Sequence, residues 1–247
     1  MDISEVALRA QVAWLRHLAD GGFDRISAGD GFAVATGLDS NSENGAVGSA
    51  RELPELVDWL RERAVPASVI VTGPPDPATT TWLIDQGLHP DRTGNNMGRR
   101  LDEAPSPPSA EWPISEVTDV RALRENQSVY AEDGWWPEPA GLDRRVEVAA
   151  RLGFGPGRPI RHWTAHHEGV PVGAATSFQF GDTVLLAACC VAAPWRRRGI
   201  GTALTQRRLA GSAVQAVVFP TQDGYHLHHS LGFELAPAHP DRCFYLP

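Results

Sequence analysis

An uninterrupted apolar run, residues 183–191, leads into a turn with two glycines and then into a helical pattern over residues 199–211. The turn consists of Arg196, Arg197, Arg198, Gly199, Ile200 and Gly201. Glycines let a backbone approach a ligand closely, and the first amides of a helix bind anions because they have no partner within the helix. A strand, a glycine turn and a helix in this order predict a site for a phosphorylated ligand.

The chain of 247 residues divides near a segment rich in proline and small polar residues, 102–113, which we expect to be a linker. We therefore expect two domains, residues 1–101 and 114–247. Apolar spacing predicts helices over residues 6–18, 51–63, 79–86, 120–130, 144–152, 199–211 and 226–231. It predicts strands over residues 31–36, 46–50, 69–72, 95–101, 162–167, 172–180, 183–191, 214–219 and 243–246. The expected class is α/β.

The two halves also share an ending. Residues 82–88 and 228–233 each read as a short helix stopped by a glycine, followed by an apolar residue that enters a strand. Gly87 and Gly232 are the two glycines. The shared pattern favours a duplicated α/β unit.

Charge excludes several classes of function. The net charge is −8, and all 22 basic residues are arginines. Up to residue 113 there are 9 arginines against 17 acidic residues, and from residue 114 onward there are 13 of each. This balance argues against nucleic acid as a partner. No apolar run approaches the roughly 20 residues of a membrane span, and the start lacks the pattern of a secretory signal, so we expect a cytoplasmic protein without a membrane partner.

The cysteines and histidines predict no metal site. Cys189 and Cys190 are adjacent in the apolar run and Cys243 stands apart, so the spacing suits buried thiols better than a disulfide framework or zinc ligands. The nine histidines show no metal-binding spacing on a helix.

Residues 191–201 and 227–233 together resemble the GCN5-related N-acetyltransferase family, over roughly residues 114–246. The resemblance implies a mixed sheet, splayed between two central strands and flanked by helices, with acetyl-CoA in the splay. It implies that the backbone of Cys189, Cys190 and Val191 binds the pantetheine arm, and that the amides of residues 197–202, Thr202 included, hold the pyrophosphate. The first half resembles a degenerate copy whose helix start, residues 48–53, lacks the glycine turn, so no cofactor is expected there.

At the catalytic groups the sequence departs from the family pattern. Family members commonly place a tyrosine, the acid for the departing thiolate, where this chain has His228. His228 is one candidate for the acid, and Tyr225, three residues earlier on the same helix, is another. A third alternative is that the thiolate leaves without an acid.

A base is useful because a lysine-like ammonium group titrates near 10.4. No carboxylate interrupts residues 184–191, so Glu132 and Asp133 are the candidates, and Trp135 and Trp136 beside them could line an acceptor pocket. We expect transfer of an acetyl group from acetyl-CoA to a primary amine of a small molecule. The alternatives are a non-catalytic acyl-CoA-binding module and transfer of a larger acyl group. The sequence identifies neither the acceptor nor the oligomeric state.

Overall fold

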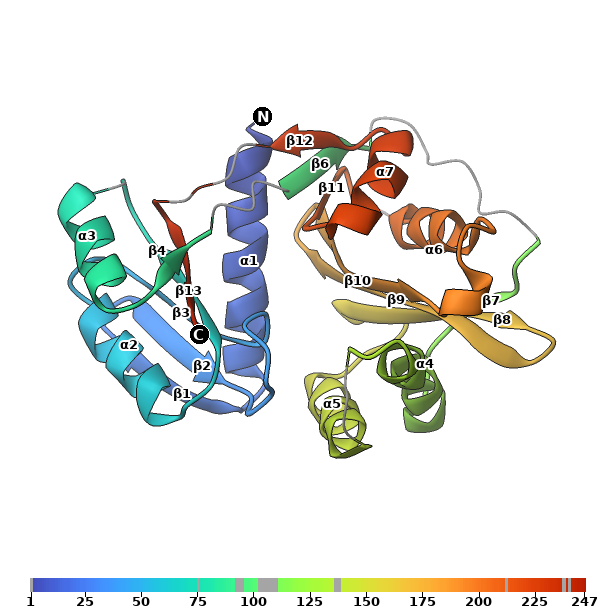
Figure 1. Ribbon diagram of the computed structural model, residues 1–247, viewed down its shortest axis with the longest axis horizontal. Coiled ribbons are helices and arrows are strands. Elements are labelled where there is room, and N and C mark those ends of the chain that lie inside the picture. Colours follow the sequence, from blue (N-terminus) through green and yellow to red (C-terminus); the bar gives the residue numbers. More distant parts are fainter. Residues whose placement is uncertain are drawn as a thin grey trace. The chain divides into compact units, whose positions relative to one another are not determined.

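The computed structural model of the protein describes residues 2–74, 76–91, 96–101, 111–135, 139–211, 213–236, 239 and 241–247. Most of the expected linker and Trp136 lie outside these ranges. The chain forms two compact units, one of Met1–Ala10 with Asn95–Ala236 and one of Gln11–Gly94 with Pro237–Pro247. This division differs from the expected boundaries at residues 101 and 114, because a strand from each half of the chain completes the sheet of the other (Figure 1).

The first unit is built on a seven-stranded sheet in the order β12-β6-β11-β10-β9-β8-β7. Its strands are β6 (Asn96–Arg100), β7 (Ile114–Glu116), β8 (Ile160–His167), β9 (Val170–Phe180), β10 (Thr183–Val191), β11 (Gln215–Val218) and β12 (Glu234–Ala236). Helices α4 (Val120–Glu132) and α5 (Pro139–Leu152) lie on one face of the sheet, and α6 (Ile200–Leu209) and α7 (Gln222–Ser230) lie on the other (Figure 1). A 3-10 turn, η1 (Ala193–Trp195), connects β10 with the glycine turn.

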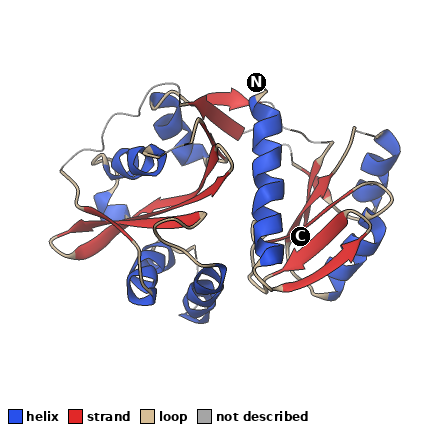
Figure 2. Ribbon diagram, turned by 180° about the vertical axis from the view of Figure 1, so that it is seen from behind, coloured by secondary structure: helices blue, strands red, loops and turns tan. Residues whose placement is uncertain are grey.

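The second unit is built on a six-stranded sheet in the order β1-β2-β3-β4-β13-β5. Its strands are β1 (Asp24–Ala28), β2 (Gly31–Ala35), β3 (Asn44–Gly48), β4 (Ala67–Val71), β5 (His89–Pro90) and β13 (Cys243–Leu246). Helices α2 (Leu53–Glu62) and α3 (Pro77–Asp85) cover one face, and α1 (Ile3–Asp20) covers the other with its residues from Gln11 onward (Figure 2).

The two sheets share one arrangement of strands. In each, a parallel pair, β10 with β11 or β3 with β4, follows an antiparallel hairpin. The next strand, β6 or β13, comes from the other half of the chain and runs antiparallel to both of its neighbours. The strand order and the pairing directions therefore match from β1 to β5 in one sheet and from β8 to β12 in the other.

Local chemistry explains where several helices begin. Asp119 caps α4 by accepting a hydrogen bond from the amide of Ala122 at 2.8 Å, and Asp76 caps α3 in the same way. Thr221 caps α7 through its hydroxyl oxygen, which accepts from the amide of Gly224 at 3.2 Å. Each cap satisfies a backbone donor that the first turn of a helix leaves unpaired.

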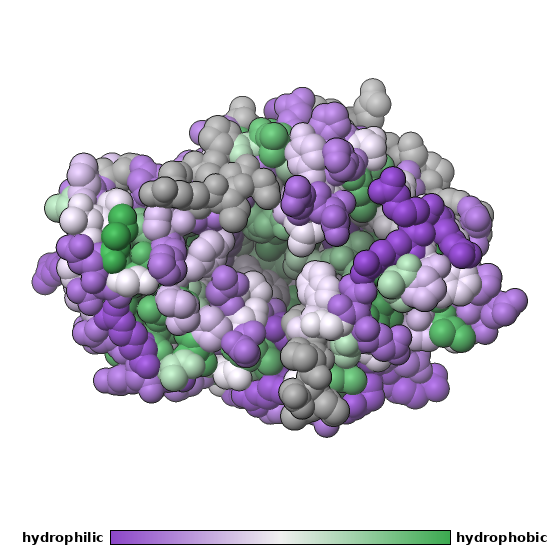
Figure 3. All heavy atoms as spheres, in the orientation of Figure 1, coloured by the Kyte–Doolittle hydropathy of each residue, from purple (hydrophilic) through white to green (hydrophobic). Residues whose placement is uncertain are grey.

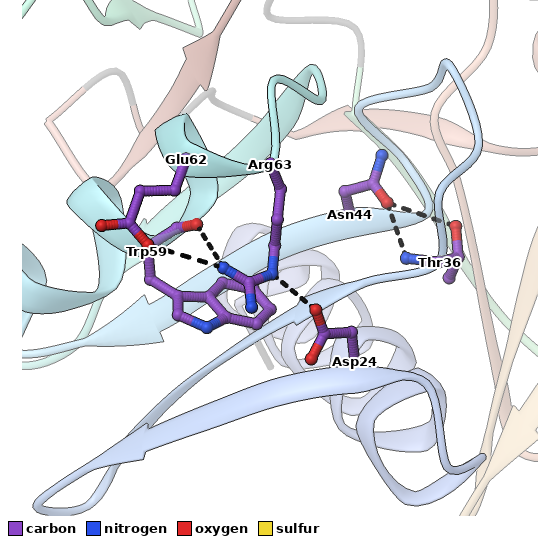
Figure 4. Close-up of polar contacts among 6 residues, drawn as sticks. All are labelled: Asp24, Thr36, Asn44, Trp59, Glu62 and Arg63. Carbon is purple, nitrogen blue, oxygen red and sulfur yellow. Dashed lines mark hydrogen bonds and ion pairs between the residues drawn. The ribbon is translucent and has the colours of Figure 1, made fainter.

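Polar contacts fix the edge of the second unit (Figure 4). The guanidinium of Arg63 lies 3.5 Å from the ring centroid of Trp59 and donates to Asp24 at 2.7 Å, which ties the end of α2 to β1. Asn44 is fully buried and accepts hydrogen bonds from the amide and the hydroxyl of Thr36. These contacts satisfy polar groups that would otherwise be costly to bury.

The structure confirms the predicted α/β class, with a mixed, splayed sheet flanked by helices. The long predicted elements are present, and β10 and β13 have the predicted bounds. The short strands β1 and β7 had no counterpart in the prediction, whereas β5 and β12 begin where the residues after Gly87 and Gly232 were expected to enter strands. On the face shown in Figure 3, hydrophilic residues predominate and exposed apolar residues are interspersed among them. Among the described residues, no helix has the length and apolar character that crossing a bilayer requires.

Candidate active site

A cavity opens in the first unit where two neighbouring strands part. The pairing of β10 with β11 runs from Thr183 opposite Gln215 to Leu186 opposite Val218 and then stops. From Ala187 to Val191, β10 continues without a paired strand on that side among the described residues. A cavity of about 1020 Å³ lies along this free edge, and α6 and α7 supply further walls. This volume is at the upper end of the range for pockets that bind small molecules.

The free edge of β10 offers backbone hydrogen-bonding groups to the cavity. The amide of Ala192 donates to the carbonyl of Val172 on the β9 side at 3.0 Å. In an antiparallel ladder, bonded and non-bonded pairs alternate, so Cys190 also bonds toward β9, whereas Cys189 and Val191 direct their amides and carbonyls to the opposite side. Of the three residues expected to bind a pantetheine arm, Cys189 and Val191 thus turn their backbone groups to the cavity.

The glycine turn presents unpaired amides to the same cavity. Gly199 has φ of +84°, and the first hydrogen bond within α6 runs from Ala203 to the carbonyl of Gly199 at 3.0 Å. The amides of Ile200, Gly201 and Thr202 therefore have no acceptor in the helix, and all three residues line the cavity. Unpaired amides at the positive end of a helix dipole are, in general, a favourable environment for the oxygens of an anion.

Two glycines allow the close packing that shapes the turn. A Cβ on Gly201 would lie 3.2 Å from Leu227 of α7 and 3.9 Å from Val191 of β10. A Cβ on Gly173 of β9 would lie 2.8 Å from Ile200, at the start of α6. Larger residues at either position would move α6 or narrow the cavity.

The three arginines of the turn have different environments. Arg196 forms an ion pair with Asp133 and donates through Nε to the carbonyl of Val191 at 3.0 Å. Arg197 is exposed and lines the cavity, with φ of +63°. The guanidinium of Arg198 lies 4.9 Å from the ring centroid of Trp195. Arg198 does not line the cavity. Arg197 is therefore the arginine side chain with the most direct access to a bound anion.

The two candidates for the base, Asp133 and Glu132, lie in different environments. Asp133 lines the cavity, where it also accepts a hydrogen bond from the Cys190 thiol at 3.4 Å. Burial, followed by the contact with Asp133, raises the pKa of Cys190 to about 12, so this cysteine is a neutral thiol at pH 7. Glu132 is exposed and is not among the lining residues. The structure therefore brings only Asp133 of this pair to the site.

The two candidates for the acid, His228 and Tyr225, also lie in different environments. His228 is 4% exposed and lines the cavity, and its Nδ1 has no hydrogen-bond partner. Burial, assisted by the positive charge of Arg208, lowers the pKa of His228 to about 4, so the imidazole is neutral at pH 7. Tyr225 packs instead against the buried cluster around Met97 and Phe233 and stacks on His229. It is not among the residues that line the cavity.

Two features of the site were not predicted. Trp112, in the expected linker, is buried and donates through Nε1 to the carbonyl of Arg198 at 3.1 Å, which supports the glycine turn. Arg208, in the last turn of α6, is buried and donates hydrogen bonds to the carbonyls of Thr176 and Ala188. Nothing in the sequence around the adjacent arginines 207 and 208 indicated that one of the two side chains would be buried. Trp135, which the sequence analysis named as a possible pocket residue, lines the cavity.

Within the described ranges, His, Cys, Asp and Glu side chains form no group of three or more that could hold a metal ion. The residues that line the cavity supply backbone amides, the carboxylates of Asp133 and Asp223, the imidazoles of His226 and His228, and arginine side chains.

Comparisons with known proteins agree with this geometry. Residues 120–233 match the model of the acetyltransferase (GNAT) family. Among curated proteins, none matches the chain. Among solved structures, a GCN5-related N-acetyltransferase from Kribbella flavida superposes with a TM-score of 0.66 at 18% identity, over 99% of this chain and 95% of that one.

Two further solved structures are similar. One is a tandem GNAT protein from the clavulanic acid biosynthesis pathway, with a TM-score of 0.55 at 14% identity, over 100% of this chain and 96% of that one. The other is a GCN5-related N-acetyltransferase from Sphaerobacter thermophilus, with a TM-score of 0.51 at 18% identity, over 87% of this chain and 76% of that one. At these identities the likeness shows the fold alone.

Proposed function

We propose that the domain containing residues 120–233, which match the model of the acetyltransferase (GNAT) family, transfers the acetyl group of acetyl-CoA to a primary amine of a small molecule. The observation that carries the proposal is the cavity at the splay, where the free edge of β10 meets the unpaired amides at the start of α6. A CoA ester needs both features, since one holds its arm and the other holds its pyrophosphate.

In this proposal, different parts of the cavity bind the pyrophosphate and the pantetheine arm. The amides of Ile200, Gly201 and Thr202 and the side chain of Arg197 bind the pyrophosphate. The edge of β10 at Cys189 and Val191 binds the pantetheine arm as an added strand would. When bound, acetyl-CoA supplies an activated acyl group, and the chain supplies its position.

Asp133 is the carboxylate that serves the amine in this proposal. It lies in the cavity beside Trp135, and its partner Arg196 is half exposed. A protonated amine enters as a cation and forms an ion pair with Asp133, and the amine must lose its proton before its nitrogen can attack the thioester. This role favours a cationic small-molecule acceptor.

We further propose that the second unit is a degenerate copy of the same fold that binds no cofactor. Its matching strands β3 and β4 pair up to Gly48 opposite Val71, so no splay separates them. At the start of α2, the carboxylate of Glu52 accepts hydrogen bonds from the amides of Ser49 at 2.8 Å and Asp30 at 2.9 Å. The chain thus supplies its own anion at the place where the other copy would bind a phosphate.

The test of the function is acetyl transfer to a panel of primary amines: amino acids, polyamines, aminoglycosides and peptides with free N-termini. We expect CoA formation that depends on the amine, together with a product heavier by one acetyl group in mass spectrometry. An Asp133→Asn variant should lose about 100-fold in kcat/KM, within the range for a general base. Glu132→Gln, the exposed neighbour, is the matched control and should retain wild-type activity.

One observation favours a second candidate, a non-catalytic acyl-CoA-binding module. The family's tyrosine position is occupied by a neutral, buried His228. Acetyl-CoA binding without turnover of any amine, and without turnover of longer acyl-CoA esters, would favour this module over the enzyme.

A further inference from the structure

A buried arginine is among the residues that line the cavity. Arg208, in the last turn of α6, is 4% exposed and lines the cavity. Its Nη1 donates to the carbonyls of Ala188 at 3.0 Å and Thr176 at 3.3 Å, and its Nη2 donates to the hydroxyl of Thr205 at 3.0 Å. These acceptors lie on β10, β9 and α6, so the guanidinium is fixed in position where the sheet begins to splay.

The charge of Arg208 has no counterion in the described part of the chain. Its hydrogen-bond partners are two carbonyls and a hydroxyl, and its Nε has no partner among the residues that the structure describes. The titratable groups that its charge affects are His228, Tyr130 and Cys189, and each of these is uncharged at pH 7. Burying a cation without an anion is costly. Such a residue, facing a ligand cavity, indicates that the ligand brings the negative charge.

The distance from the turn identifies which part of the ligand arrives there. Arg208 comes nine residues after Gly199, which is about 13 Å along a helix at 1.5 Å per residue. The phosphates at the start of α6 are therefore too far from Arg208 to be its anion. The surroundings at this end, Leu186, Ala187 and His228, suit a small uncharged group such as a thioester.

We propose that Arg208 stabilises the negative charge that develops on the sulfur atom of acetyl-CoA when the thioester is cleaved. The proposal rests on the acetyl transfer proposed above. In that step the amine nitrogen forms a bond to the thioester carbonyl carbon. The carbon–sulfur bond then breaks, and its electron pair stays on sulfur. The products are an amide and the CoA thiolate, and the proton that leaves the nitrogen passes to a base or to water.

This role explains how the site works without a cationic acid. A neutral His228 is a poor proton donor, whereas a guanidinium carries its positive charge without needing a proton from solution at neutral pH. A fixed positive charge that is itself buried stabilises a developing anion strongly, because little solvent must reorganise around it. The thiolate therefore leaves as an anion beside Arg208 and is protonated after release.

The test compares two ligands whose only relevant difference is at sulfur. Free CoA can ionise to a thiolate, and acetyl-CoA cannot, so acetyl-CoA controls for every other effect of pH on binding. The affinities of both ligands are measured by calorimetric titration between pH 6.5 and 9. We expect the affinity for CoA, relative to acetyl-CoA, to rise about tenfold or more over this range, since an adjacent opposite charge shifts a thiol pKa downward by one to three units.

Two variants assign the effect to this residue. Arg208→Met keeps an unbranched apolar stem without the charge, and we expect its ratio of affinities to change less than twofold over the same range. Arg207→Met, on the exposed neighbour, should behave as wild type does. A flat ratio in the wild-type protein, or an equal rise in Arg208→Met, overturns the assignment to Arg208. If neither ligand binds the wild-type protein, it is the proposed function itself that fails.

Discussion

Replacing Phe244 by alanine is expected to destabilise the second unit by about 3–5 kcal/mol, the range for removing a fully buried aromatic side chain. Phe244 lies on β13, four residues from the end of the chain, and is 0% exposed. Its ring belongs to a core that, apart from Leu246 on the same strand, comes from the first half of the chain and includes Leu56, Val69 and Leu83. Urea denaturation followed by circular dichroism measures the loss.

The matched control is Leu235→Ala on β12, where the leucine is 53% exposed. A substitution at such a position changes the free energy of unfolding by less than about 0.5 kcal/mol. If Phe244→Ala lost no more than Leu235→Ala, β13 would not be a structural strand of the six-stranded sheet. The exchange of strands between the two halves would then be wrong.

Replacing Gly201 by arginine is expected to weaken acetyl-CoA binding at least 100-fold, or about 2.7 kcal/mol. The new side chain would start 3.2 Å from Leu227 and extend into the cavity. Because the substitution adds a positive charge at a phosphate site, electrostatics alone would tighten binding. A loss therefore reports the blocked space, and the rise in Tm caused by saturating acetyl-CoA measures it.

Gly211→Arg provides the same chemical change just beyond the other end of α6, where a Cβ would meet nothing within 4 Å. This control should be stabilised by acetyl-CoA as wild type is. An equal stabilisation of Gly201→Arg would contradict the position assigned to the cofactor.

Much of the fold was predictable because its main elements carry strong local patterns. The apolar run of β10 and the helix of α6 have clear signals at their own positions. β1 and β12, in contrast, lie at sheet edges and have largely polar or exposed residues, so their sequences show no apolar alternation. The pairing of β6 with β11, and of β13 with β4, joins distant parts of the chain, and a local pattern cannot identify such partners.

In the candidate site, too, some features could be predicted from the local sequence and others could not. Its backbone features follow from glycine spacing, because Gly199 at positive φ and the helix start after it are local properties. The roles of its side chains depend on tertiary packing. Adjacent arginines 207 and 208 look alike in the sequence, yet one is exposed and the other is buried against the carbonyls of β9 and β10. Asp133 and Glu132 differ likewise, since only one of these neighbours faces the cavity.

The most direct test of the central claim is a hydrogen-exchange footprint of acetyl-CoA on the wild-type protein, read by mass spectrometry of peptides. The account predicts slower exchange in peptides covering residues 189–191, where the amides of Cys189 and Val191 face the cavity, and residues 200–202, whose amides have no acceptor within α6. Peptides covering residues 48–53 should be unchanged, because Glu52 already occupies that turn. No protection at residues 200–202 at a saturating ligand concentration, or protection at residues 48–53 instead, would contradict the account.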